Sequence, residues 1–206
     1  MKQIFVHGLG QTSSSWKAVL AELDGLDHNI CLNLPDLVQG KEVDYNNLYK
    51  AFVSECNRYN ERLDLCGLSL GGVLCLNYAI DYPQKVHSLI LIATQYKMPK
   101  RLLQLQNMLF HFMPSSSFEQ MGFGKKDFIQ LCKTMAELDF SKSLSKVSCR
   151  TLVVCGEKDF ANRKASDELA NALANAKIHI MKGAGHEINI EVPKSLGKEL
   201  QDFWRE

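Results

Sequence analysis

The chain has 206 residues, of which 46% are hydrophobic and 23% are charged, a composition typical of a globular protein with one sizeable core. Its 24 basic and 23 acidic residues give a formal net charge of +1 and form no block of like charge. That balance argues against nucleic acid and against an anionic membrane as partners. We therefore expect one domain, 1–206, with neither kind of partner.

Six short apolar runs have the length of strands, and stretches of helix length separate them. Because the runs are apolar almost throughout, they are typical of strands covered on both faces, as in a parallel sheet. The alternation predicts an α/β fold: a doubly wound, mostly parallel sheet of about six strands with helices on both faces. In chain order, the predicted strands are 3–6, 29–34, 62–66, 86–93, 150–155 and 177–181, and the predicted helices are 14–23, 45–59, 70–81, 164–174 and 193–204.

The first predicted strand begins almost at the N-terminus, so the apolar run before His7 is far shorter than the core of a signal peptide. No window approaches the roughly 18 apolar residues of a membrane span. The seven cysteines contain no C-x-x-C pair and are typical of buried thiols in a reducing compartment, rather than of disulfides or zinc ligands. We expect a soluble, cytoplasmic protein.

The alternation is interrupted between the fourth and fifth predicted strands. Residues 95–148, which we call the insertion, carry helical patterns, the turn-rich stretch MPSSSF and the glycine-bearing stretch MGFGKKD. We expect the insertion to form a short helical lid over one edge of the sheet, and not a second domain.

Ser69 lies between Gly67 and Gly71 in the stretch DLCGLSLGG, after a predicted strand and before a predicted helix. On a strand–turn–helix unit, G-x-S-x-G is the nucleophile elbow, in which a strained turn exposes the serine hydroxyl. Residues two before and two after the serine approach each other closely, and glycine tolerates this because it has no Cβ. A turn without chemistry is the alternative interpretation.

A serine nucleophile needs a base, an acid that orients the base, and donors for the oxyanion. Of the six histidines, His186 is the one that follows a strand in a loop, where the catalytic residues of open α/β sheets collect. Asp159 follows the preceding strand and lies far enough beyond it to reach His186. Glu157, nearer the strand end, is expected to be structural. The order serine, acid, histidine is the one that the elbow fold uses.

Backbone N–H groups are the expected oxyanion donors. Leu70 directly follows Ser69, at the positive end of a predicted helix. The second donor is expected to be the N–H of Leu9, because Gly8 and Gly10 allow a sharp turn after the first strand. A tight turn with no further role is the alternative for this stretch.

With these residues in place, the chain resembles the α/β-hydrolase superfamily, in particular its small single-domain members with a lid. The resemblance implies Ser69 as nucleophile, Asp159 as acid, His186 as base, and Leu9 and Leu70 as oxyanion-hole residues. The chain departs from the family pattern by lacking its first two strands and by reading NLPDLVQG where the family has D-x-P-G-x-G. The matching stretches span nearly the whole chain in family order: FVHGLGQTSSSW, LPDLVQG, LCGLSLGG, LVVCGEKD and GAGHEINIEVP.

The leading hypothesis is a cofactor-free and metal-free serine hydrolase that cleaves a small carboxylic ester through an acyl-enzyme intermediate. The alternatives within the superfamily are a thioesterase, an amidase or peptidase, a carbon–carbon bond hydrolase, and a lyase or synthase that forms no covalent intermediate. A non-catalytic binding protein on the same scaffold is a further alternative, which the complete triad argues against. Fold alone does not decide between these activities.

The insertion holds five of the seven methionines and six of the ten phenylalanines. They could form its own core and its contact with the sheet. Alternatively, some face Ser69 and line a flexible apolar slot, a role that suits methionine. For the second case, the side chains expected to bind substrate are Met98, Phe110, Met113 and Phe123.

Overall fold

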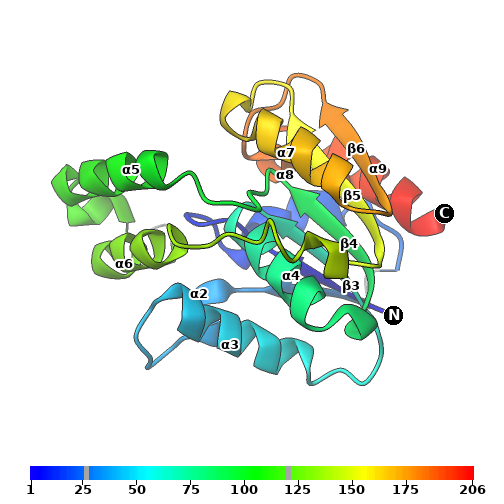
Figure 1. The fold of residues 1–206 in the computed structure, drawn as a ribbon, viewed down its shortest axis with the longest axis horizontal. Coiled ribbons are helices and arrows are strands. Elements are labelled where there is room, and N and C mark those ends of the chain that lie inside the picture. Colours follow the sequence, from blue (N-terminus) through cyan, green and yellow to red (C-terminus); the bar gives the residue numbers. More distant parts are fainter. Residues whose placement is uncertain (26–27, 119–121) are drawn as a thin grey trace.

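The structure, a computed structural model, describes residues 1–25, 28–118 and 122–206 of the chain. In these ranges six strands form one sheet in the order β2-β1-β3-β4-β5-β6, and every neighbouring pair is parallel (Figure 1). The predicted doubly wound sheet of about six strands is therefore confirmed. The strands are β1 (Lys2–Val6), β2 (Asn29–Leu32), β3 (Leu63–Leu68), β4 (Val86–Ile92), β5 (Arg150–Gly156) and β6 (Ala176–Met181).

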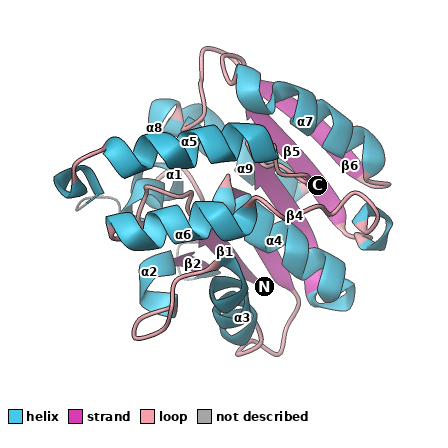
Figure 2. Cartoon of the chain, turned by 60° about the vertical axis from the view of Figure 1, so that its left-hand side comes forward, coloured by secondary structure: helices cyan, strands magenta, loops and turns pink. Residues whose placement is uncertain are grey.

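Helices cover both faces of the sheet, as predicted. In chain order, the helices of the described ranges are α1 (Lys17–Leu20), α2 (Leu34–Leu37), α3 (Tyr45–Cys56), α4 (Leu70–Asp81), α5 (Lys100–Phe112), α6 (Lys125–Met135), α7 (Phe160–Ala172), α8 (Ile188–Glu191) and α9 (Pro193–Arg205). One face packs against α3, α4 and α7, and the other against α1, α8 and α9 (Figure 2). In the described ranges, no helix combines the length and the mean hydropathy that crossing a membrane requires.

Strand side chains alternate between two hydrophobic clusters, one on each face of the sheet. In β1, Ile4 and Val6 belong to the cluster that includes α3 and α4, whereas Phe5 belongs to the cluster that includes α1 and α9. All three side chains are fully buried. Burying one such side chain contributes about 1.5–3 kcal/mol, so the two clusters together hold the helices on the sheet. Coverage of both faces explains why the strands read as continuous apolar runs.

The largest departure from the predicted elements concerns α7. The sequence predicts this helix over 164–174, but it begins at Phe160, directly after Asp159. Phe160 is exposed, so the first helical turn carries no apolar stripe that would reveal it. Smaller departures lie at element ends: β2 stops before α2, and the helix predicted at 14–23 is a 3-10 helix, η1 (Ser13–Trp16), continued by α1.

The insertion forms α5, α6 and a 3-10 helix, η4 (Ser115–Phe118), to one side of the sheet (Figure 1). Its two ends pair with each other: the Met98 N–H donates to the Leu138 carbonyl at 3.0 Å, and the Phe140 N–H donates to the Tyr96 carbonyl at 2.8 Å. Farther out, three rings pack edge to face with centroids 5.0 to 5.9 Å apart. The insertion therefore has an aromatic core of its own, made by Phe110, Phe118 and Phe128.

The strand order places a topological switch point at β1. The chain passes from β1 to β2 on one side, whereas β3 and the later strands lie on the other side. At such a point, successive connections leave in opposite directions, and ligands of open α/β sheets bind in the crevice at the carboxyl ends of the strands. The loop after β1 and the turn after β3 both lie at this edge, so the fold predicts a site there.

Candidate active site

Ser69 occupies the turn between β3 and α4, with backbone angles φ 52° and ψ −114°. Such a conformation costs a residue with a Cβ about 1–3 kcal/mol and persists only where the surroundings enforce it. Here the Ser69 N–H donates to the Ile92 carbonyl of β4 at 2.8 Å, and the Ser69 carbonyl accepts the first helical hydrogen bond of α4, from Val73, at 3.0 Å. Strand and helix therefore hold the turn from both sides.

The two glycines of the motif are required by the close approach of backbone segments. A Cβ at Gly67 would collide with the backbone of Gly71, and a Cβ at Gly71 would collide with the carbonyl group of Val6 in β1. Neither contact can be relieved by rotating a side chain. The spacing G-x-S-x-G therefore follows from packing α4 directly onto β1 and β3, with Ser69 at the tip of the turn.

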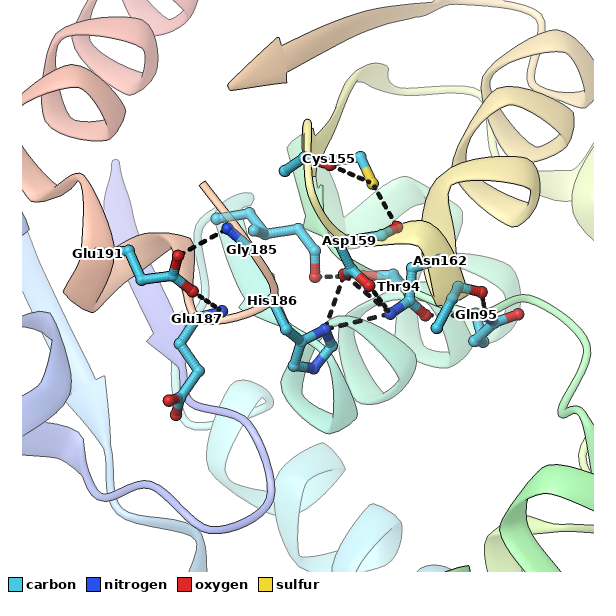
Figure 3. A network of polar contacts seen from close by, with 12 residues as sticks. Thr94, Gln95, Cys155, Asp159, Asn162, Gly185, His186, Glu187 and Glu191 are labelled. Atoms are coloured by element: carbon cyan, nitrogen blue, oxygen red, sulfur yellow. Dashed lines mark hydrogen bonds and ion pairs between the residues drawn. The ribbon is translucent and has the colours of Figure 1, made fainter. Parts of the chain in front are cut away.

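His186 lies in the loop after β6, and its Nδ1 is 2.8 Å from Oδ2 of Asp159 (Figure 3). The Asp159 side chain is buried, whereas that of His186 is 42% exposed, so the imidazole can reach a bound molecule. Burial by itself raises the pKa of the Asp159 carboxyl, but hydrogen bonds from His186 and Asn162 outweigh it and lower the pKa below its ordinary value. The histidine thus has a charged, fixed acceptor behind it.

Asn162 is a site residue that the sequence did not reveal. Its Nδ2 is 2.9 Å from each carboxylate oxygen of Asp159 and 3.1 Å from Nδ1 of His186 (Figure 3). The sequence predicts the helix only from residue 164, so it does not place Asn162 on the helical turn that follows Asp159. The signal that could have found it is its position three residues after Asp159, on the first turn of a helix.

Backbone-directed carboxylates shape the loop that carries His186. The Glu191 carboxylate accepts from the N–H groups of Gly185 and Glu187, at 2.6 and 3.0 Å. Glu157 accepts from the Gly183 N–H at 2.8 Å and makes no contact with His186 among the described residues. Its position is the structural one that the sequence suggested.

A buried amide pair connects this loop to the loop after β1. Gln11 Nε2 donates to Asn189 Oδ1 at 3.2 Å, and Asn189 Nδ2 donates to Gln11 Oε1 at 3.1 Å. Both side chains are buried, and Asn189 is fully so. The pair therefore fixes the stretch that contains Leu9 relative to the stretch that contains His186.

The expected oxyanion donors both border the site. Leu70 is the first residue of α4, so its N–H has no acceptor within the helix. The Leu9 N–H has no acceptor among the described residues. Ahead of it, the buried His7 accepts from the Leu34 N–H at Nε2, 3.0 Å, and contacts the Gly8 carbonyl through Nδ1, 2.8 Å. Burial lowers the pKa of His7, which favours the neutral ring that can accept at Nε2.

One cavity of about 580 Å³ brings the predicted residues together. Ser69, Asp159, His186, Leu9 and Leu70 all line it. The rest of its wall is mostly apolar and comes from α4, the end of β4, the insertion and the first turn of α7, namely Val73, Ala93, Gln95, Met98, Pro99, Leu103, Leu109, Phe128, Cys132, Met135, Ala161 and Asn162. A surface hollow of about 680 Å³ between α6 and the segment before α3 contains none of the predicted site residues.

Of the four side chains expected to bind substrate, Met98 lines this cavity. Phe110, Met113 and Phe123 are not among its described lining residues. Phe110 packs edge-on against Phe128, at 5.0 Å between centroids, and Phe123 is buried in the core. Phe110 packs in the aromatic core of the insertion, and Met113 and Phe123 pack with the hydrophobic cluster that includes α3 and α4. Phe128 and Met135 line the cavity.

The described residues contain no cluster of three or more His, Cys, Asp or Glu side chains placed to hold a metal ion. All seven cysteines are free thiols, six of them buried. The polar groups that line the cavity are a hydroxyl, an imidazole with its carboxylate, two side-chain amides, backbone N–H groups and the thiol of Cys132, whose pKa burial raises to about 12.

Comparison with known proteins agrees with this architecture. Monoacylglycerol lipase ABHD6 from Homo sapiens is 22% identical over 250 residues, which cover 97% of this chain and 74% of the lipase. Among solved structures, the enol-lactonase from Burkholderia xenovorans LB400 superposes with a TM-score of 0.82 at 17% identity, over 100% of this chain and 92% of that one. A thermophilic esterase from Thermogutta terrifontis superposes with a TM-score of 0.79 at 20% identity, over 100% and 89%.

The structural neighbours share the fold, which confirms the architecture expected from the sequence. The sequence model of the alpha/beta hydrolase family matches residues 3–196, nearly the whole chain. With a six-stranded parallel sheet and a G-x-S-x-G turn after β3, the chain belongs to the alpha/beta hydrolase family.

Proposed function

We propose that the protein is a serine hydrolase that cleaves a small carboxylic ester, with Ser69 as nucleophile, His186 as base and Asp159 as the acid that orients His186. The observation that carries the proposal is one apolar cavity holding a serine on a strained turn and a histidine bonded at 2.8 Å to a buried carboxylate. A buried, charged partner for an exposed imidazole is what a general base requires.

In the proposed reaction, Ser69 Oγ attacks the ester carbonyl carbon while its proton passes to His186 Nε2. The N–H groups of Leu9 and Leu70 stabilise the oxyanion of the tetrahedral intermediate. His186 then returns the proton to the leaving alcohol, which leaves an acyl group on Ser69. Water then attacks the acyl group while its proton passes to His186, and His186 returns that proton to Ser69 Oγ as the acid is released. Asp159 keeps the hydrogen of His186 on Nδ1, so that Nε2 is free to accept.

Three of the similar proteins have names that support an ester: one is a monoacylglycerol lipase, one an enol-lactonase and one an esterase. Thioesters, amides and carbon–carbon bonds are alternatives that the same groups could attack, because the pocket decides the substrate. The test is a screen of the purified protein against p-nitrophenyl esters of graded chain length, with matched thioesters and amides. Turnover of the amides or thioesters alone would contradict the ester assignment.

Within the ester series, we expect kcat/KM to rise from acetyl to butyryl or hexanoyl and then to drop. Each methylene buried against the apolar wall adds up to about 0.8 kcal/mol, about fourfold in kcat/KM, until the cavity is full. The slope should flatten in Met98→Ala, since Met98 lines the cavity, and should persist in Met108→Ala, since Met108 is exposed. A maximum at acetyl would show that the cavity does not bind the acyl chain.

The two acids after β5 provide a matched pair of variants. Asp159→Asn should reduce kcat by about 10³- to 10⁴-fold, because an amide neither stabilises the imidazolium nor enforces the required tautomer. Glu157→Gln should change kcat little, since Glu157 accepts from the backbone N–H of Gly183 and not from His186. Steady-state kinetics on the best ester measures both. The reverse ranking of the two variants would make Glu157 the orienting acid.

A further inference from the structure

The side chain of Asn162 lies at the centre of a chain of polar contacts that ends at His186 (Figure 3). Asn162 is 8% exposed and lines the cavity. Its Nδ2 is 2.9 Å from both oxygens of Asp159, and its Oδ1 accepts a hydrogen bond from Gln95 Nε2 at 2.8 Å. The proposed reaction needs no direct chemistry from the side-chain amides of Asn162 and Gln95.

The Asp159 carboxylate determines the direction of every hydrogen bond in this series of polar contacts. The charged Asp159 can only accept, so both neighbours must donate to it: His186 through Nδ1 and Asn162 through Nδ2. With Nδ2 turned toward Asp159, Oδ1 of Asn162 must point away, and there it meets the donor Nε2 of Gln95. Each group therefore has one orientation, and the order runs from Gln95 through Asn162 and Asp159 to His186.

The 3.1 Å contact between Asn162 Nδ2 and His186 Nδ1 leads to the same arrangement. Two nitrogens cannot both point a hydrogen at each other. If Nδ1 carried no hydrogen, its lone pair would face the Asp159 oxygen at 2.8 Å, which is repulsive. Nδ1 therefore carries the hydrogen and Asn162 directs its own hydrogens to the carboxylate.

We propose that Asn162 is a positioning residue for the acid: its amide holds the Asp159 carboxylate in line with His186, and Gln95 holds the amide. The inference rests on the proposed function, since it assigns Asp159 to orienting His186. Without the Asn162 amide, the buried Asp159 carboxylate loses a hydrogen-bond donor that partly neutralises its charge. The carboxylate is then held less firmly in line, and more of its negative charge remains to stabilise the imidazolium. Catalysis should then weaken, and His186 should keep its proton to higher pH.

Several other charged groups on the surrounding elements have partners of their own, whereas Lys158 and Lys182 are exposed lysines on the turns after β5 and β6. On the loop of His186, Glu191 accepts from two backbone N–H groups and Glu187 accepts from Gln11 at 2.9 Å. On α7, Arg163 pairs with Asp167 at 3.4 Å. At the neck of the insertion and after β5, the remaining pairs and contacts are Lys97 with Asp139, Lys100 with Glu137, and Glu157 with the Gly183 N–H. Among the described residues, Asp159 is the charged group that is bonded to the ring of His186.

Two variants of Asn162 test the proposal. Asn162→Leu removes the donor at similar size, and Asn162→Asp replaces it by a second carboxylate beside the first. The matched control is Asn171→Asp, the same change at an exposed position of α7. Both test variants should lower kcat/KM by about ten- to hundredfold, the range for losing a hydrogen bond to a charged group. The acid limb of the pH profile should move to higher pH, and furthest in Asn162→Asp, because a second carboxylate adds negative charge close to the imidazolium.

An NMR titration of the His186 ring gives a readout that needs no substrate. Its midpoint should rise in both variants of Asn162 and stay at the wild-type value in Asn171→Asp. If Asn162→Leu does not fold, as judged by circular dichroism, the isosteric Asn162→Asp carries the test. A midpoint unchanged in the folded variants, with kcat/KM within about twofold of wild type, would overturn the positioning role. Absence of any ester turnover by the wild type, together with a shifted midpoint, would instead refute the esterase function and retain the positioning role.

Discussion

Replacing Ser69 by alanine should abolish ester hydrolysis almost completely, lowering kcat by about four to six orders of magnitude. The oxygen of the Ser69 hydroxyl forms the acyl bond, and no other described hydroxyl group lines the cavity. Alanine keeps the Cβ of serine, so the turn with φ 52° should be retained and the fold should be unchanged. Steady-state kinetics and thermal unfolding of the same preparation measure the two expectations together.

The control for this variant is Ser116→Ala, which removes a hydroxyl from an exposed position of the insertion. It should retain wild-type activity. If Ser69→Ala keeps more than about a tenth of the wild-type rate, Ser69 is not the nucleophile, whatever the geometry of its turn.

His186→Ala should be comparably severe, with a loss of about four to six orders of magnitude in kcat, because nucleophile and base act as one unit. For the same reason, the double variant Ser69→Ala with His186→Ala should be hardly slower than either single variant. His179→Ala is the matched control: His179 lies in β6 and pairs with Glu199 of α9, at 3.0 Å, away from the cavity. Additive losses in the double variant, or equal losses from both histidines, would contradict the assignment of His186 as base.

Most of the fold was predictable because a parallel sheet covered on both faces imposes continuous apolar runs on its strands. All six strands lie where such runs occur, and the helix after Ser69 begins and ends as predicted. The start of α7 was not predictable from periodicity, since Phe160 at its first position is 85% exposed. The turn begins there because Asp159 and Asn162 are bonded across it, at 2.9 Å. Side-chain pairing, and not an apolar stripe, marks this helix start.

The site likewise contains residues that the sequence predicts and residues that it does not. Ser69, Asp159 and His186 follow from their places after strands, because the carboxyl ends of parallel strands meet at one edge. Gln95 and Asn162 are 67 residues apart in sequence and come into contact only in the folded chain. The sequence around each residue therefore does not predict its contact with the other. In the insertion, counting Met and Phe residues does not show which side chains face inward. Phe110 packs on Phe118 and Phe128, at 5.9 and 5.0 Å, because a short helical insertion needs a core of its own.

The most direct test of the proposed function is the mass of the protein during turnover. The wild-type protein is mixed with p-nitrophenyl butyrate, quenched in acid within the pre-steady-state phase, and digested for peptide mapping. We predict a butyryl adduct on the peptide that contains Ser69, absent from Ser69→Ala under the same conditions. Hydrolysis that proceeds without an adduct, or with the adduct on another residue, would contradict acyl transfer through Ser69.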